Sequence, residues 1–303
     1  MFKVLVLSTL FISVLFAREV VPDDYYISND TDLSYIYAKE YQDILPSLKK
    51  YQQNIITGYE KEFGYKLDTT LYVGLASLNN QIANGFSTQI PFNLQMFYPA
   101  GAGEMDYFCS TSWLKTLIIH ETAHNFQLNA NENDLSIASR KIFGNSPFSS
   151  LIFIPLFPFP NITESSFIVE GNGVVNESRY GNGGRLFSGY ALAEVITLAK
   201  AGYITPELMY NSTLDFPYGE KFYIVGGFFQ QYLVNIYGID RVNSYFKTYA
   251  TQAFPFFTNK MFVKQFGETF ETLLAQFAEH LQNKHKNFIA SKGKIVAKSK
   301  QFY

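Results

Sequence analysis

The sequence predicts an α+β protein in which a small N-terminal mixed sheet and one central helix precede a mostly helical C-terminal part. Between residues 68 and 109, short runs such as Leu71–Leu75 and Phe92–Tyr98 have the composition of strands. After Thr163, apolar residues recur at helical spacing through most of the chain. Hydrophobic residues make up 47% of the 303 residues and charged residues 17%, a composition that supports a substantial core.

The first residues have the features of an export signal. Lys3 precedes an apolar stretch from Val4 to Phe16, and Ala17 offers a small residue for cleavage. The stretch is shorter than the roughly 20 residues that span a bilayer. We therefore expect residues 1–17 to be a signal peptide and the protein to be periplasmic or secreted, with no stable membrane insertion after cleavage. An uncleaved N-terminal anchor is the alternative.

The N-terminal subdomain is expected over residues 18–130. Residues 18–32 are polar and acidic and predict a loose lead-in, while residues 33–63 have the spacing of one long helix or two. Pro46 is placed to kink this helix and Gly64 to stop it. Two turns and two strands follow; the turns are predicted at Asn79-Asn80 and Asn84-Gly85, and the strands over 71–75 and 92–98.

The clearest helix is predicted over residues 112–128, with Thr111 or Ser112 as its N-cap. A second, mainly helical subdomain is expected over residues 131–303. An irregular stretch is predicted over residues 129–164, across the boundary between the two subdomains, and includes the apolar, proline-rich segment 151–160. That segment is interpreted as a buried loop, with a cleft wall or a membrane-touching loop as alternatives. The predicted helices are 164–179, 188–201, 218–237, 240–250 and 268–289.

Charge and cysteine content argue against nucleic-acid binding and against a disulfide-held fold. The formal net charge is −2, which gives no electrostatic case for binding nucleic acid. Cys109 is the only cysteine, so no intramolecular disulfide can form. The fold must therefore be held by its core and by any metal that it binds.

The central helix carries the motif His120-Glu121-Thr122-Ala123-His124. Two histidines four positions apart project from one helix face, one turn apart, and can bind one Zn²⁺ together. Glu121 lies on the flank of that face, where it can reach a zinc-bound water as a general base without binding the metal. A catalytic zinc site needs a third protein ligand. His280 and His285 lie in a C-terminal helix and are expected to be solvated, so a carboxylate from a second helix is the expected ligand.

At Ser166–Glu177 the chain resembles the gluzincin metallopeptidases, especially the peptidase MA-like families, which pair H-E-x-x-H-x-x-Q with a later E-G-x-A-x-x-x-E helix. The matching positions are His120, Glu121, His124, Gln127, Glu170, Gly171 and Glu177. The resemblance implies a zincin-like fold, with Glu170 as the third zinc ligand. It also implies that Glu177 is a carboxylate that holds a ligand histidine from behind. The chain departs from the pattern at Gly173, where alanine is usual, and at Val175, where an aromatic residue is common.

The resembled families often place a tyrosine in a Y-x-x-G pattern at the start of a later helix. Tyr223-Ile-Val-Gly-Gly227 fits this pattern, which implies that Tyr223 donates a hydrogen bond to the oxyanion; Tyr218 is the second choice. The strand near residues 90–98 stands where these families have the edge strand that binds substrate. The resemblance covers roughly residues 68–250.

The sequence thus predicts a zinc-dependent metallopeptidase that acts on a peptide or protein substrate, with Glu121 as general base. The alternative is a non-catalytic binding protein of the cell envelope on the same scaffold, whose metal site would have no accessible open position. The apolar segment 151–160 and the lysine-rich end of the chain also allow an envelope-associated module. Substrate identity and the choice between endo- and exopeptidase action stay open.

Overall fold

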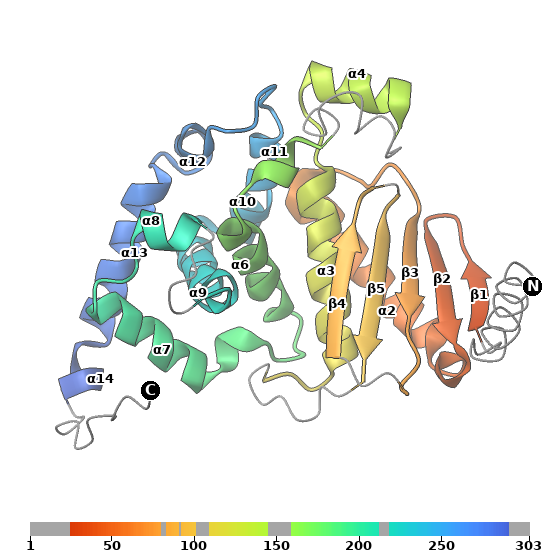
Figure 1. The fold of residues 1–303 in the computed structure, drawn as a ribbon, viewed down its shortest axis with the longest axis horizontal. Helices are drawn as coiled ribbons and strands as arrows, with labels where there is room; N and C mark the ends of the chain where they lie inside the picture. The colour runs from red at the N-terminus through yellow and green to blue at the C-terminus, as the bar shows by residue number, and fades with distance from the viewer. Residues whose placement is uncertain are drawn as a thin grey trace, which may run out of the picture.

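The computed structural model describes residues 25–79, 83–90, 92–100, 109–144, 159–211 and 218–290. Its N-terminal part contains a five-stranded sheet, and the remainder is mostly helical (Figure 1). The strands are β1 (Tyr25–Asn29), β2 (Leu33–Ala38), β3 (Leu71–Leu75), β4 (Ala83–Thr88) and β5 (Leu94–Pro99). The predicted α+β class with a small N-terminal mixed sheet and a mostly helical remainder is confirmed.

The sheet has the order β1-β2-β3-β5-β4. The three inner strands are parallel, whereas β1 and β4 pair antiparallel with their neighbours at the two edges. The prediction of a substrate-binding edge strand near 90–98 is therefore wrong, because β5 lies between β3 and β4. Within the described residues, the edge of the sheet next to β5 is formed by β4, where the sequence predicted a turn at Asn84-Gly85.

Two helices cover one face of the sheet: α2 (Leu45–Tyr59), which continues into a π-helical turn η2 (Glu60–Gly64), and α3 (Trp113–Asn129). Gln95 of β5 shows that both lie on the same face. Its side chain accepts from Gln52 of α2 at 2.7 Å and donates to Asn125 of α3 at 2.8 Å. The central helix was predicted within one residue at each end, and Ser112 is its N-cap.

The prediction that residues 33–63 are entirely helical is wrong at its start. Leu33–Ala38 forms β2, which pairs with β1 on one side and β3 on the other, and the short helix η1 (Lys39–Tyr41) follows. A run of six apolar and aromatic residues is too short for its periodicity to separate strand from helix. Pro46 does not kink a helix but lies in the first turn of α2, where its missing N–H has no helical partner to lose.

Two further segments differ from expectation. The predicted loose lead-in contains β1, which is ordered by pairing with β2. The predicted irregular stretch 129–164 contains α4 (Asp134–Phe143), capped by the side chain of Asn133, and the short helix η5 (Pro160–Thr163). Residues 151–158 of the apolar segment, the signal sequence and the lysine-rich end of the chain lie outside the described residues.

The later part of the chain is helical, as predicted, with two short helices, α8 and α12, that the sequence did not indicate. The predicted helix 240–250 is divided at Ser244 into α10 and α11. The helices are α6 (Ser166–Glu177), α7 (Gly189–Lys200), α8 (Pro206–Tyr210), α9 (Glu220–Tyr237), α10 (Ile239–Asn243), α11 (Tyr245–Tyr249), α12 (Thr258–Phe266), α13 (Phe270–Lys284) and α14 (Lys286–Ala290), with η6 (Arg185–Phe187) between α6 and α7.

Helix α6 lies between α3 and α9 (Figure 1). Its approach to α9 depends on glycine: a Cβ at Gly171 would lie 2.5 Å from the carbonyl carbon of Gly226, and a Cβ at Gly227 would lie 2.5 Å from Val174 Cγ1. One buried apolar cluster includes residues of both the sheet and the helical part, from Leu33 to Leu281. Because α6 also packs on α3, this core brings the two halves of the predicted metal motif together.

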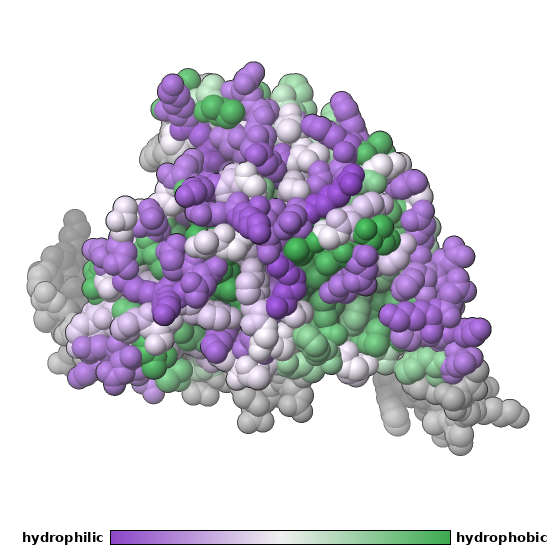
Figure 2. Space-filling model, turned by 180° about the vertical axis from the view of Figure 1, so that it is seen from behind, coloured by the Kyte–Doolittle hydropathy of each residue, from purple (hydrophilic) through white to green (hydrophobic). Residues whose placement is uncertain are grey.

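The surface is mixed in character. Seen from behind, hydrophilic and hydrophobic residues alternate over the molecule in patches (Figure 2). Among the helices that the structure describes, none combines the length and the apolar character needed to cross a bilayer.

Candidate metal centre

Helix α3 presents His120 and His124 toward Glu170 of α6 and Glu121 toward β4. His120, Glu121 and His124 are each less than a tenth exposed. The two imidazole rings meet nearly at right angles, with centroids 4.6 Å apart, as expected for side chains one turn apart on one face. The helical spacing predicted from the sequence therefore places both rings at one point.

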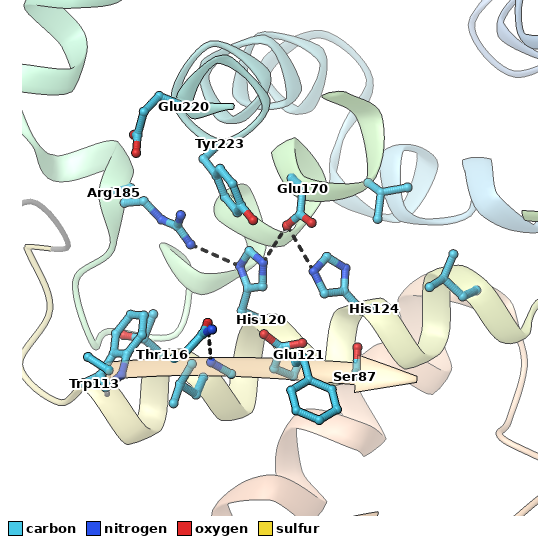
Figure 3. Close-up of a pocket in the computed structure, with 17 residues that line it drawn as sticks. Ser87, Trp113, Thr116, His120, Glu121, His124, Glu170, Arg185, Glu220 and Tyr223 are labelled. Carbon is cyan, nitrogen blue, oxygen red and sulfur yellow. Dashed lines mark hydrogen bonds and ion pairs between the residues drawn. The ribbon is translucent and has the colours of Figure 1, made fainter. Parts of the chain in front are cut away.

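Glu170 of α6 completes the cluster. Its Oε2 lies 3.1 Å from His120 Nε2 and 3.2 Å from His124 Nε2 (Figure 3). The three residues offer two ring nitrogens and one carboxylate oxygen, all within 4.8 Å of one another. The structure thus brings together the three residues that the sequence suggested as ligands.

The outer nitrogen of each ring faces an acceptor. His120 Nδ1 lies 3.0 Å from Glu177 Oε2, and His124 Nδ1 lies 2.7 Å from Gln127 Oε1. A carboxylate and an amide oxygen can only accept, so each Nδ1 is the donor and carries a proton. Each Nε2 faces the carboxylate of Glu170 and shares a proton with it when no metal is bound. A bound cation would take the place of that proton, with the outer Nδ1 still protonated, as in metal-ligating histidines.

The electrostatics of the cluster also favour a cation. Burial lowers the pKa of His120, but hydrogen bonds to the carboxylates of Glu170 and Glu177 outweigh it and raise that pKa to about 9. Burial raises the pKa of Glu170, but the two histidines more than compensate and hold it well below its usual range. A site that favours a proton between Nε2 and a carboxylate favours a metal cation for the same reason, because both place positive charge there. The residues present therefore fit a metal ion.

Glu177 is held from behind by an arginine. Its carboxylate is fully buried and accepts from Arg185 Nε and Nη2, each at 2.8 Å, and from the Arg185 backbone N–H at 3.2 Å. The guanidinium lowers the pKa of Glu177 to about 2 against the opposing effect of burial. Sequence reasoning missed Arg185. A buried carboxylate behind a metal ligand is expected to pair with a cationic side chain, so the sequence could have indicated that a lysine or arginine lies there, but not which one.

Glu121 lies at the floor of the cluster beside β4. A Cβ at Gly85 of β4 would lie 2.6 Å from Leu117 Cδ2 and 3.3 Å from Glu121 Oε1, so glycine lets the edge strand approach the helix. Glu121 Oε2 is buried and has no hydrogen-bond partner within the described part of the chain. A buried carboxylate oxygen of this kind is suited to hold a water in the cleft.

The cluster opens into a cleft of about 520 Å³. Its wall on one side is β4, and on the other side α6 and α9. The polar and aromatic lining includes Asn84, Phe86, Ser87, Trp113, Thr116, Arg185, Glu220 and Tyr223. The metal-binding face is therefore accessible from outside, and the free edge of the sheet borders it.

Tyr223 lies over His120. Its ring is nearly parallel to the imidazole, with centroids 6.2 Å apart, and the guanidinium carbon of Arg185 lies 4.7 Å from its centre. The hydroxyl points toward Glu170 (Figure 3). Burial and the nearby Glu170 raise the pKa of Tyr223, which keeps its hydroxyl protonated and able to donate. Tyr218, by contrast, is exposed and is not among the residues that line the cleft.

The two remaining histidines lie elsewhere. His280 is exposed on α13, where its ring contacts Tyr232, and His285 is partly exposed at the end of that helix. Neither belongs to the cluster that could hold a metal.

Comparison with known proteins adds a fold-level likeness only. No family model and no curated protein matches the chain. Among solved structures, IMPa from Pseudomonas aeruginosa in complex with an O-glycopeptide is similar, with a TM-score of 0.32 and 12% sequence identity. The match covers 78% of this chain but 28% of that one, so the chain spans less than a third of the length of IMPa. These values are too low to assign the chain to the family of IMPa.

The fold and the site together define a class: an α+β protein with a candidate two-histidine, one-glutamate metal centre at the floor of an accessible cleft.

Proposed function

We propose that the protein is a zinc-dependent metallopeptidase. The observation that carries the proposal is the convergence of the Nε2 atoms of His120 and His124 with the Glu170 carboxylate at an accessible cleft, with the buried Glu121 beside them. Three protein ligands of the nitrogen and oxygen type, with one open position, are the donor set of catalytic zinc. The Nδ1-protonated rings and their outer carboxylate support fit the same metal.

The proposed chemistry is hydrolysis of a peptide bond. When bound, zinc supplies Lewis-acid polarisation of the scissile carbonyl and lowers the pKa of a water. His120, His124 and Glu170 hold the ion. Glu121 takes the proton of the attacking water and delivers it to the leaving amine.

Tyr223 is the proposed donor to the oxyanion. Its hydroxyl faces the cluster from α9, opposite the side on which Glu121 lies (Figure 3). Donors fixed on a rigid element stabilise charge as it develops in the transition state. The guanidinium of Arg185 and the imidazole of His120 both contact the phenol ring and hold it in place.

A peptide substrate fits the shape of the cleft. Among the described residues β4 pairs with β5 alone, so its other edge offers backbone N–H and C=O groups beside the cluster. An extended chain can add to such an edge by β-augmentation. We also propose, from residues 1–17, that the protein is exported and that the signal is removed.

The test compares wild-type protein with Glu121→Gln. Metal content is measured on both, and cleavage is profiled by mass spectrometry on a peptide library. The expected result is equal zinc content and cleavage by the wild type only. Glu279→Gln, on the exposed face of α13, is the matched control and should cleave normally. An active Glu121→Gln protein would contradict the mechanism, and a wild type that binds zinc and peptides without cleaving them would favour the binding-protein alternative.

A further inference from the structure

A chain of buried amides leads away from His124. Gln127 Oε1 lies 2.7 Å from His124 Nδ1, and Gln127 Nε2 donates to Asn172 Oδ1 at 2.7 Å. Asn172 Nδ2 donates to Asn243 Oδ1 at 2.9 Å, and Asn243 Nδ2 donates to Glu62 Oε2 at 2.8 Å. We refer to Gln127, Asn172 and Asn243 as the amide relay. All three are fully buried, and they come from α3, α6 and α10.

The direction of the relay is fixed at both ends. At one end, Gln127 Nε2 also donates to the backbone carbonyl of Val169 at 3.1 Å, so its oxygen must face His124. At the other end, Asn243 faces the carboxylate of Glu62, which can only accept. Every link therefore donates toward Glu62, and the histidine at the start must donate as well.

Asn176 braces the middle of the relay. It lies one turn beyond Asn172 on α6, and its Nδ2 donates to the Asn172 backbone carbonyl at 2.9 Å and to Asn243 Oδ1 at 3.1 Å. Its Oδ1 accepts from Arg179 at 2.7 Å. The hydrogen bonds of Asn176 are thus consistent with the donor-to-acceptor direction of the relay. A buried polar network is stable only when its groups are paired in this way.

The relay ends on an ion pair of the same kind as the one behind His120. Arg179 binds both oxygens of Glu62, at 2.9 and 2.5 Å, and the pair is partly exposed on the far side of the amides. Glu177 and Arg185 form the corresponding pair, in direct contact with His120. Each histidine is therefore backed by a carboxylate clamped by arginine, one directly and one through three amides.

We propose that Glu62, on the π-helical turn after α2, is a positioning residue for His124 that acts through the amide relay. The negative charge of Glu62 polarises the three amides in turn and keeps the His124 proton on Nδ1. The Nε2 atom of His124 is then a stronger electron-pair donor to the metal. This inference rests on the proposed metal site, and it concerns how that site is held rather than which substrate is cleaved.

The test uses the full-length protein and Glu62→Gln. Zinc affinity is measured by competition with a chelator, and the exchange rate of the His124 Nδ1 proton is measured by NMR on the zinc-loaded protein. The expected result is a roughly tenfold weaker affinity, at the lower end of what outer partners of ligand histidines contribute, together with faster proton exchange. A Glu62→Gln protein with unchanged affinity and exchange overturns the proposal, even if its thermal stability falls.

Two further variants separate positioning from general charge or folding effects. Glu60→Gln removes a charge from the same turn, where Glu60 pairs only loosely with Lys66 at 3.8 Å, and should change neither reading. A comparable loss in Glu60→Gln would overturn the proposal. A double variant combines Asn243→Asp with Glu62→Gln. It moves the carboxylate one link closer to His124, and the amide introduced by Glu62→Gln can donate to that carboxylate. Its zinc affinity should exceed that of either single variant. Failure of this rescue also counts against the relay.

The proposed function can fail separately. If the wild-type protein binds no zinc, the proposed metal centre is wrong. If zinc binds to the wild type and to Glu62→Gln with the same affinity, only the proposed role of the amide relay is wrong.

Discussion

Gly173 of α6 lies directly against the imidazole of His120. A Cβ at this position would lie 2.5 Å from His120 Cε1 and 2.8 Å from both ring nitrogens. The resembled families usually carry alanine at this position, and the sequence alone gives no reason for the glycine. The structure gives a steric reason for it: α6 approaches α3 so closely that the ring occupies the space of a methyl group.

Replacing Gly173 with alanine should therefore weaken metal binding. The methyl group must displace either the ring of His120 or the backbone of α6, and overpacking of this kind costs roughly 1–3 kcal/mol. Zinc affinity by chelator competition and thermal unfolding measure the two effects. Gly189→Ala on α7 is the control, since a Cβ there meets nothing within 4 Å. Equal affinity in Gly173→Ala and wild type would show that the ring is free to shift.

Exchanging Glu177 for glutamine should lower zinc affinity by about 10- to 100-fold, because outer partners of ligand histidines contribute that much. It also leaves Arg185 without its carboxylate in a buried site, which should destabilise the fold by about 3–5 kcal/mol. Chemical denaturation of the metal-free protein isolates this second effect. If both quantities matched those of the wild type, Glu177 would have no role behind His120.

Tyr223→Phe should reduce kcat by about 10²- to 10³-fold, the usual effect of losing one oxyanion donor, while zinc content stays constant. The ring keeps its contacts with His120 and Arg185, so we expect the fold to be preserved. Tyr218→Phe, which lies on the exposed surface, should retain full activity. The two variants are compared on the same peptide. A larger loss in Tyr218→Phe would reverse the assignment made here.

Glu164 should make stability depend on pH. Burial raises the pKa of its carboxyl to about 7 despite hydrogen bonds from Tyr245, the Ser165 backbone, Tyr210 and Thr258. The folded state thus holds a proton that the unfolded state releases near pH 4.5. This proton contributes fully to the free energy of unfolding below pH 4.5. The contribution, on the order of 3 kcal/mol, is lost as the pH rises through the folded-state pKa of about 7.

Glu164→Gln should remove this dependence. The measurement is urea denaturation of the metal-free protein at several pH values between 4.5 and 7, with wild type alongside. Other groups also titrate there, so the informative quantity is the difference in slope between the two proteins. Equal slopes would mean that Glu164 is ionised in the fold.

The metal ligands could be predicted because each depends on a short-range pattern. His120 and His124 are one turn apart on a strongly indicated helix, and Glu170 lies in a second helix with a recognisable motif. By contrast, Arg185 and the relay could not be predicted. Their roles depend on which buried polar atoms meet after α3, α6 and α10 pack, and nothing in the spacing of Asn172 and Asn243 indicates it.

The errors in the fold have a common cause. β2 and β4 are short, and each is specified by pairing with other strands rather than by its own residues: β2 pairs with β1 and with β3, which lies on the far side of α2 in the sequence, and β4 pairs with β5. Local pattern favoured a helix over the first and a turn at Asn84-Gly85 in the second. In β4 the glycine is required by the neighbouring helix and not by a turn, which only the packing of Leu117 against it reveals.

The glycine contact between Gly171 and Gly226 has a consequence for how this scaffold can change. It brings the backbone of α6, which carries Glu170, into direct contact with the backbone of α9, which carries Tyr223. The distance between these two side chains is therefore set by a backbone contact rather than by side-chain packing. The opposite wall of the cleft is β4, where Gly85 is held against α3 by a close approach, while Asn84, Phe86 and Ser87 also line the cleft. Substitutions at these three side chains can therefore alter one wall of the cleft while the spacing of Glu170 and Tyr223 stays fixed.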